Sequence, residues 1–217
     1  MSTGFVHFVE YDLQIIALAW LCLLYAIKIF QLSRLPMRRE KSPGKGSPVL
    51  GTLRSYANIF MPWSMESSRR HFWRWLEFGA YHVGAGIAIL NTFTSPFAPA
   101  MMTQPVRWAF AILIAPALFL GLVKLARRIL RPEMRLISTP DDYFSLASVE
   151  IYFISAIIAL LMNNPLSRTV YFLITTAFLF YVPFSKISHY IYFFFAATVT
   201  GARYGRHGVR PQMRKAE

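Results

Sequence analysis

The sequence predicts an all-α protein, a bundle of five transmembrane helices with its N-terminus outside and its C-terminus in the cytoplasm. Composition is the first reason. Of the 217 residues, 55% are hydrophobic and 15% are charged, which is more apolar and less charged than a typical soluble domain. The surplus apolar surface must face lipid or a partner, which excludes a soluble enzyme. The second reason is that long apolar runs alternate with basic segments, a pattern typical of membrane-spanning chains.

Five stretches are apolar and long enough to cross a bilayer, which needs about 20 residues of helix. They cover residues 13–32, 76–95, 107–126, 144–162 and 169–199. The last is about ten residues too long, so we expect it to tilt or project past the bilayer. Pro183 lies within it, lacks a backbone N–H and should kink it. We treat residues 1–217 as a single integral membrane domain.

Lysine and arginine in the short loops predict the orientation. Eight of these cations lie at residues 33–70, between the first two stretches, and five lie in the C-terminal tail. Five more lie at the end of the third stretch and in the loop after it (Lys124, Arg127, Arg128, Arg131 and Arg135), against only Arg107 and Arg168 near the other two loops. We therefore place the three basic segments in the cytoplasm and the protein in the inner, cytoplasmic membrane. The net charge of +13 then belongs to membrane loops, and nucleic-acid binding is not needed to explain it.

The long loop at residues 33–70 has two interpretations. Proline and glycine break its first half, whereas its second half carries Tyr56, Ile59, Phe60, Met61 and Trp63. Such side chains suit either a docking surface for a cytoplasmic subunit or a linker that touches the lipid interface.

Two of the five histidines, His82 and His189, lie inside apolar runs, where a histidine is costly and marks a functional site. At the helical rise, His82 lies between about 7 Å past Glu77 and about 18 Å past Arg70, and His189 about 15 Å before Val199. The two histidines are therefore expected to meet in the inner half of the membrane.

Facing imidazoles in a helix bundle suit the axial ligation of haem iron. Small residues beside His82, in the run 79–86, leave space for a flat macrocycle. The alternative from the residues alone is a pair of structural histidines with hydrogen bonds between helices, and a glycine run that serves ordinary helix packing. The single cysteine, Cys22, permits no internal disulfide, and there is no C-x-x-C-H haem-attachment motif.

The residues around both histidines resemble the membrane cytochrome b (gamma) subunit family of respiratory nitrate reductases. Tyr81-His82-Val83-Gly84 is similar to the family's first haem-ligand motif, and residues 183–189 match its P-F-S-[KR]-x-x-H signature. The segments 126–132 and 135–142 resemble its basic third loop. Related subunits occur in complexes linked to sulfite reductase or similar to heterodisulfide reductase, so nitrate need not be the substrate.

The resemblance implies haem b held by His82 and His189, and one haem per chain. Two-haem members carry further histidines where this chain has Thr92 and Tyr171, so the outer haem is expected to be missing. His71 and His207 are a poor second pair, because their depths, about 16 Å and about 27 Å from the first pair if helical, disagree.

Three charged residues complete the predicted site. Glu150 lies about 9 Å into its stretch and is a candidate acceptor of a quinol proton; a structural hydrogen bond or salt bridge is the alternative. Lys186 and Arg74 are candidate partners of the haem propionates, or they extend to lipid headgroups.

The resemblance implies a subunit that passes electrons between quinone and a cytoplasmic iron–sulfur partner. The chain carries no catalytic domain of a reductase, so it is not a complete enzyme by itself. A haem-free structural anchor of a multisubunit complex is the alternative. A transporter is a third possibility, which the lack of a sequence repeat disfavours.

Overall fold

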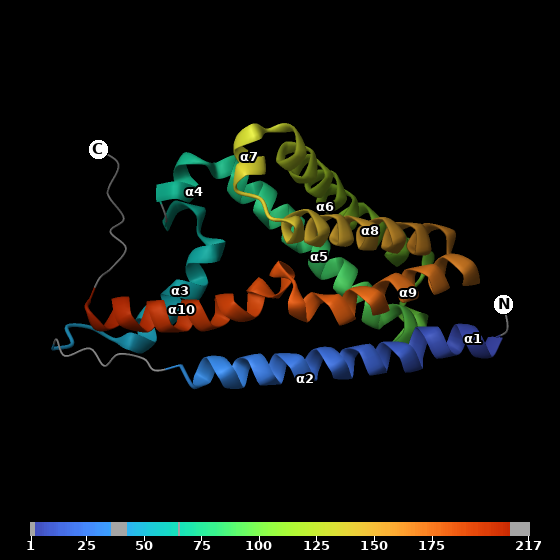
Figure 1. Ribbon diagram of the computed structural model, residues 1–217, viewed down its shortest axis with the longest axis horizontal. Coiled ribbons are helices and arrows are strands. Elements are labelled where there is room, and N and C mark those ends of the chain that lie inside the picture. The colour runs from blue at the N-terminus through green and yellow to red at the C-terminus, as the bar shows by residue number, and fades with distance from the viewer. Residues whose placement is uncertain (1–2, 36–42, 65, 209–217) are drawn as a thin grey trace. The chain divides into compact units, whose positions relative to one another are not determined.

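The computed structural model describes residues 3–35, 43–64 and 66–208 (Figure 1). These ranges are largely helical and contain no strand, so the predicted all-α class is confirmed. Packing divides the chain into two compact units. The first unit comprises Met1–Tyr25 and Glu77–Ile187, and the second unit comprises Ala26–Leu76 and Ser188–Glu217.

The first unit contains the N-terminal helical segment and the helices that follow residue 76. Its elements are α1 (Thr3–His7), a π-helical turn η1 (Phe8–Asp12), the first part of α2 (Leu13–Ser33), most of α5 (Phe72–Phe97), η4 (Pro99–Met101), α6 (Gln104–Leu130), α7 (Pro132–Leu136), α8 (Pro140–Met162), α9 (Pro165–Tyr181) and η5 (Val182–Phe184). Helix α8 packs between α6 and α9 (Figure 1).

Local capping explains where α8 and α9 begin. Thr139 and Asp142 form a reciprocal capping box at the start of α8, and Asn164 accepts a hydrogen bond from the Ser167 N–H at the start of α9. A proline occupies the first turn of each helix, where its missing N–H costs nothing. Between them Asn163 ends α8 in the left-handed conformation, at φ 45°. Two residues thus suffice to reverse the chain.

The core of the first unit joins α5, α6, α8 and α9. Its fully buried side chains include Phe153, Phe172, Ile114 and Ala88. The N-terminal segment is attached to it by polar contacts, because Gln14 donates from Nε2 to the Phe172 carbonyl at 2.9 Å and to Thr176 Oγ1 at 2.7 Å.

Four helical segments in the described ranges are long and apolar enough to cross a membrane: Gly4–Ser33, Gln104–Leu130, Pro140–Met162 and Pro165–Phe184. They contain or overlap four of the five predicted stretches and make the chain compatible with a multi-pass membrane protein. The predicted stretch 76–95 lies in α5, which has 26 residues but is not among these four. The fifth span and the orientation of the termini stay predictions.

The prediction of one helical stretch over residues 169–199 was wrong. Helix α9 ends at Tyr181, and α10 (His189–Arg206) begins only after the short turns η5 and η6 (Lys186–Ser188). Pro183 cannot donate an N–H to the helical ladder. The Ser185 hydroxyl replaces missing backbone bonds, donating to the Val182 carbonyl at 2.9 Å and accepting from the Ile187 N–H at 3.1 Å. The predicted distortion at Pro183 is therefore a complete break.

The second unit is centred on α3 (Pro48–Ala57) and α10, which pack side by side (Figure 1). It also contains η2 (Asn58–Phe60), η3 (Pro62–Ser64) and α4 (Glu66–Arg70). Glycines allow the two helices to approach closely, because a Cβ at Gly201 would lie 2.8 Å from the Gly51 carbonyl oxygen. The Tyr56 hydroxyl adds a 2.6 Å contact with Thr198 Oγ1. The loop 33–70 is therefore partly helical and packs on the chain's own C-terminal helix.

Replacing Gly201 with alanine is expected to force α3 and α10 apart. The added methyl group would overlap backbone atoms, and such overpacking costs about 1–3 kcal/mol. Gly4→Ala is the control, because Gly4 is also helical and a Cβ there meets no atom within 4 Å. Thermal unfolding should show a Tm lower by several degrees for the first variant only. Equal Tm values for both variants would contradict the close packing.

Candidate functional site

Glu150 is buried in the first unit, where α5, α6 and α8 meet. Its side chain is 3% exposed, and its Oε1 accepts a hydrogen bond from the Tyr81 hydroxyl at 3.2 Å. Helix α6 makes room for the carboxylate with Gly121, since a Cβ there would collide with Oε1. Oε2 has no hydrogen-bond partner among the described residues. The structural hydrogen bond weighed as an alternative is thus present, and the other carboxylate oxygen is buried without a hydrogen-bond partner among the described residues.

A row of charged side chains leads from the α6 end towards Glu150. Arg127 Nη1 lies 3.5 Å from Glu77 Oε2, and both side chains are partly exposed. Lys124, one turn before Arg127, interacts electrostatically with both Glu77 and Glu150. Its Nζ also lies 4.0 Å from the centre of the Tyr81 ring. Polar and ionisable groups therefore extend from an exposed surface to the buried carboxylate. The sequence did not indicate this role for Lys124, Tyr81 or Glu77.

His82 follows Tyr81 on α5, and its side chain is exposed. Its Nδ1 lies 2.7 Å from the Phe78 carbonyl oxygen. A carbonyl can only accept, so Nδ1 is the donor in this contact, and in the neutral imidazole Nε2 then carries the lone pair, the form that binds metals. Gly79 and Gly86 lie three residues before and four after His82, on the same helical face. A Cβ at either glycine would meet no atom within 4 Å.

Gly84 differs from those two glycines. A Cβ at Gly84 would overlap the Ala117 side chain on α6, so this glycine serves close helix packing, which was one of the two interpretations of the run 79–86. The three glycines of this run thus divide into one that packs α5 on α6 and two at which an added Cβ would meet no atom within 4 Å.

His189 is the first residue of α10, and its side chain is exposed. It belongs to the second unit, whereas His82 belongs to the first. Their pairing therefore stays a prediction. Arg74 is exposed in the first turn of α5 and also belongs to the second unit. His71 immediately precedes α5, and His207 follows the end of α10.

Thr92 and Tyr171, two positions far apart in sequence, are brought together in the buried core of the first unit. Their hydroxyls lie 2.7 Å apart, and the Tyr152 hydroxyl lies 2.8 Å from Thr92 Oγ1. The rings of Tyr152 and Tyr171 stack at 5.9 Å, and the Tyr152 hydroxyl donates to the Ala88 carbonyl at 2.7 Å. These side chains fill the space between α5, α8 and α9. The sequence analysis identified Thr92 and Tyr171 but missed Tyr152.

Lys186 is part of a hydrogen-bonded cluster, here called the clamp. Its other members are Thr139, Asp141, Asp142 and Tyr181. Lys186 Nζ lies 2.7 Å from Asp142 Oδ2 and 2.9 Å from Thr139 Oγ1. The Lys186 N–H and the Tyr181 hydroxyl donate to Asp141 at 3.3 Å and 2.7 Å. The clamp thus joins the start of α8 to the broken segment 182–188. Lys186 already has a carboxylate partner, a contact that the sequence did not indicate.

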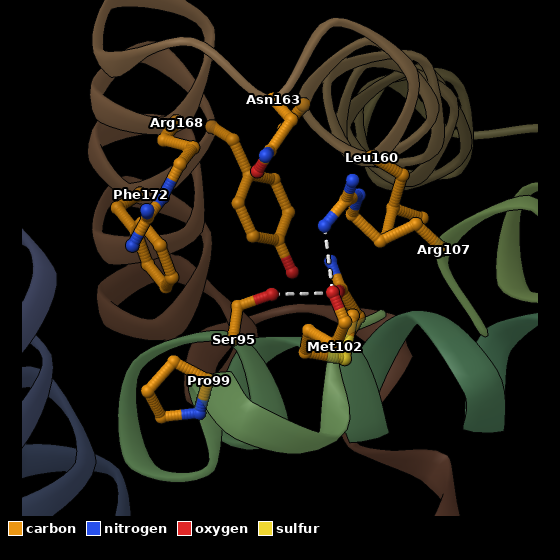
Figure 2. A pocket seen from close by; sticks show the side chains of 11 residues that line it. Ser95, Pro99, Met102, Arg107, Leu160, Asn163, Arg168 and Phe172 are labelled. Atoms are coloured by element: carbon orange, nitrogen blue, oxygen red, sulfur yellow. Dashed lines mark hydrogen bonds between the residues drawn. The ribbon is translucent and has the colours of Figure 1, made fainter. Parts of the chain in front are cut away.

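A second polar site lies where α5 and α8 end and α6 and α9 begin (Figure 2). It is a cavity of about 160 Å³. Its lining residues are Asn91, Ser95, Pro99, Met102, Arg107, Ala159, Leu160, Asn163, Arg168, Tyr171 and Phe172. The sequence identified Arg107 and Arg168 only as the two cations of the predicted outer loops.

Replacing Asp142 with asparagine is expected to loosen the segment 182–188. The variant keeps the size of the side chain but removes the charge that Lys186 and Arg128 face. Such a partly exposed pair contributes about 1 kcal/mol or less, so amide hydrogen exchange in this segment should rise by up to about fivefold. Glu133→Gln, on an exposed residue of α7, is the control. Unchanged exchange in both variants would show that the charge does not hold the segment.

No family model, curated protein or solved structure matched this chain. The family resemblance therefore rests on the quoted residue patterns alone. His82 on α5 and the buried Glu150 on α8 are the candidate functional residues of the first unit.

Proposed function

We propose that the chain is a mono-haem cytochrome b membrane subunit, which transfers electrons between the quinone pool and a cytoplasmic iron–sulfur partner. The setting of His82 is the observation that carries the proposal. The Phe78 carbonyl fixes its tautomer, as hydrogen bonds to a carbonyl or carboxylate do for most metal-binding histidines. Gly79 and Gly86 leave the same face of α5 uncovered. Haem binding needs both features: the iron needs a ring nitrogen with a lone pair, and the flat macrocycle needs an uncovered helix face.

His189 is the proposed second ligand, on the basis of the P-F-S-K-x-x-H resemblance. The break after Tyr181 supports this role, because it allows the chain to change direction before His189 begins a new helix. A haem b bound by these two histidines supplies one-electron chemistry, while the protein sets its position and its potential. Arg74 is the better candidate for a propionate partner, since Lys186 is already paired with Asp142.

The core of the first unit supports a single haem. Thr92 and Tyr171 occupy the positions where two-haem members of the resembled family carry histidine. Their hydroxyls contact each other directly, and Tyr152 stacks against Tyr171. A second macrocycle would have to displace three buried and hydrogen-bonded side chains. Unsatisfied polar groups inside a bilayer cost several kcal/mol each, so this arrangement resists such a displacement.

Glu150 is the proposed proton acceptor for quinol oxidation. Its Oε2 has no hydrogen-bond partner among the described residues and can take a proton directly. Tyr81 donates to the other oxygen and holds the carboxylate in place. The charged groups of Lys124, Glu77 and Arg127 lead from there towards an exposed surface. This row offers a route by which the proton can leave.

The proposed partner is a soluble iron–sulfur subunit that docks on the predicted cytoplasmic face. The loop between α6 and α8 carries exposed Arg131 and Arg135, and α6 ends with Arg127 and Arg128. A surface of this charge attracts an acidic partner and speeds its association. The localisation that follows is the inner, cytoplasmic membrane.

The first prediction from the proposed function concerns the haem. Purified protein should show one low-spin haem b per chain by pyridine haemochrome assay. His82→Ala and His189→Ala should each abolish the normal spectrum, because each removes an axial ligand. His71→Ala and His207→Ala are the controls and should preserve it. A ratio near two would disprove the single-haem proposal. A ratio near zero would favour the haem-free structural anchor, with His82 bonded to its own helix.

The second prediction concerns Glu150. Glu150→Gln keeps the acceptor for Tyr81 and fits beside Gly121, but it cannot take a proton. Haem content should be unchanged, whereas the rate of quinol-dependent haem reduction should fall by roughly a hundredfold, the low end of the usual contribution of acid–base catalysis. Glu133→Gln is the matched control. Wild-type kinetics across the pH range in the Glu150 variant would leave this residue a purely structural role.

A further inference from the structure

The two cations of the predicted outer loops converge on one cavity. Positive charges are disfavoured in outer loops because they oppose the orientation of the chain. Arg107 lies in the first turn of α6 and Arg168 in the first turn of α9, 61 residues apart in the sequence. Both nevertheless line the cavity of about 160 Å³ in the first unit. The cavity therefore has two guanidinium groups in its lining.

The two arginines are bound differently. Arg168 Nη2 lies 2.6 Å from Glu10 Oε2, in a pair whose carboxylate side chain is 5% exposed. Its charge is therefore compensated. Arg107 donates from Nη1 to the Met102 carbonyl at 2.6 Å (Figure 2), and no described carboxylate forms an ion pair with it. A guanidinium has five N–H donors, so Arg107 brings one uncompensated charge and further donors to the cavity.

Polar groups surround this charge, while the cavity walls are partly apolar. Figure 2 shows Ser95, Asn163 and Arg107 around the open space, with Leu160, Met102 and Phe172 beside them. Ser95 donates to Asn91 Oδ1 at 2.8 Å. The volume corresponds to roughly five water molecules at about 30 Å³ each. That is too small for a macrocycle and below the usual range of pockets for drug-sized ligands, about 300–1,000 Å³.

We propose that this cavity binds a phosphate-type oxyanion through the guanidinium of Arg107. The charge, the donors and the small volume all fit a tetrahedral oxyanion, for which arginine is a preferred ligand. Two sources share this chemistry. One is the phosphodiester of an outer-leaflet phospholipid whose acyl chains remain in the bilayer, and the other is free inorganic phosphate. The proposal depends on neither haem nor quinone.

The experiment compares the full chain with Arg107→Gln, Arg107→Lys and the control Arg131→Gln, which removes an exposed cation of the basic loop. Native mass spectrometry of protein released from nanodiscs of phosphatidylglycerol and phosphatidylcholine measures retained phospholipid. A titration with sodium phosphate against sodium chloride at equal ionic strength measures the shift in Tm.

A phospholipid retained by the full chain and Arg131→Gln but lost from Arg107→Gln would support the proposal with a lipid source. A saturable phosphate-dependent rise in Tm with the same variant pattern would support it with a free anion. In either case Arg107→Gln should weaken binding about tenfold or more, and Arg107→Lys should restore part of it. The proposal is overturned if neither ligand binds the full chain, or if Arg107→Gln binds as the full chain does.

Discussion

Buried polar side chains form hydrogen bonds between the helices of the first unit, and these bonds constrain how the helices face each other. Gln14 bonds to Thr176, Tyr81 to Glu150, and Thr92 to both Tyr152 and Tyr171. Each contact joins two different helices at one register. Water that could replace a lost partner is scarce inside a bilayer, so a helix that rotated or slid by one residue would leave several groups unsatisfied. Apolar packing alone tolerates such shifts far better, because lipid tails are as apolar as the side chains.

The same constraint explains why the helix can be interrupted between α9 and α10. Buried backbone can leave helical geometry only where other groups satisfy its N–H and C=O groups. Ser185 supplies one donor and one acceptor within the break, and Asp141 accepts the Lys186 N–H. The segments 135–142 and 183–189, which resemble two separate motifs of the family, are therefore joined in this chain by the hydrogen bonds of Lys186 to Thr139, Asp141 and Asp142. The break occurs where side chains replace the missing backbone bonds.

Apolar runs predicted where four long apolar helices lie, because hydrophobicity over about 20 residues is a local property. The predicted stretches began at residues 144 and 169, later than α8 and α9, whose starts are marked by Thr139, Asn164 and the prolines that follow them. Pro183 indicated a distortion but not the complete break before His189. The contacts between helices were not predictable in the same way. No sequence periodicity indicates that Lys186 forms an ion pair with Asp142 and does not contact lipid or a cofactor. Nor does it indicate that Tyr152 contacts Thr92 and Tyr171. The division into two units was not predicted either, because its boundaries cross the interiors of α2 and α5, and a continuous helix gives no local signal that its two ends pack in different units.

The contact between Gly121 and Glu150 has a consequence for how this protein can vary. The carboxylate occupies the volume that any larger residue at position 121 would need, so the two positions cannot change independently. A substitution at Gly121 is tolerable only after position 150 has become smaller, and a small residue at position 150 leaves a void that a larger residue at position 121 can fill. Each single step passes through a clash or a cavity, and only the double change restores packing. We therefore expect glycine with glutamate, or a larger residue with a smaller one, to be inherited together across natural variants of the chain.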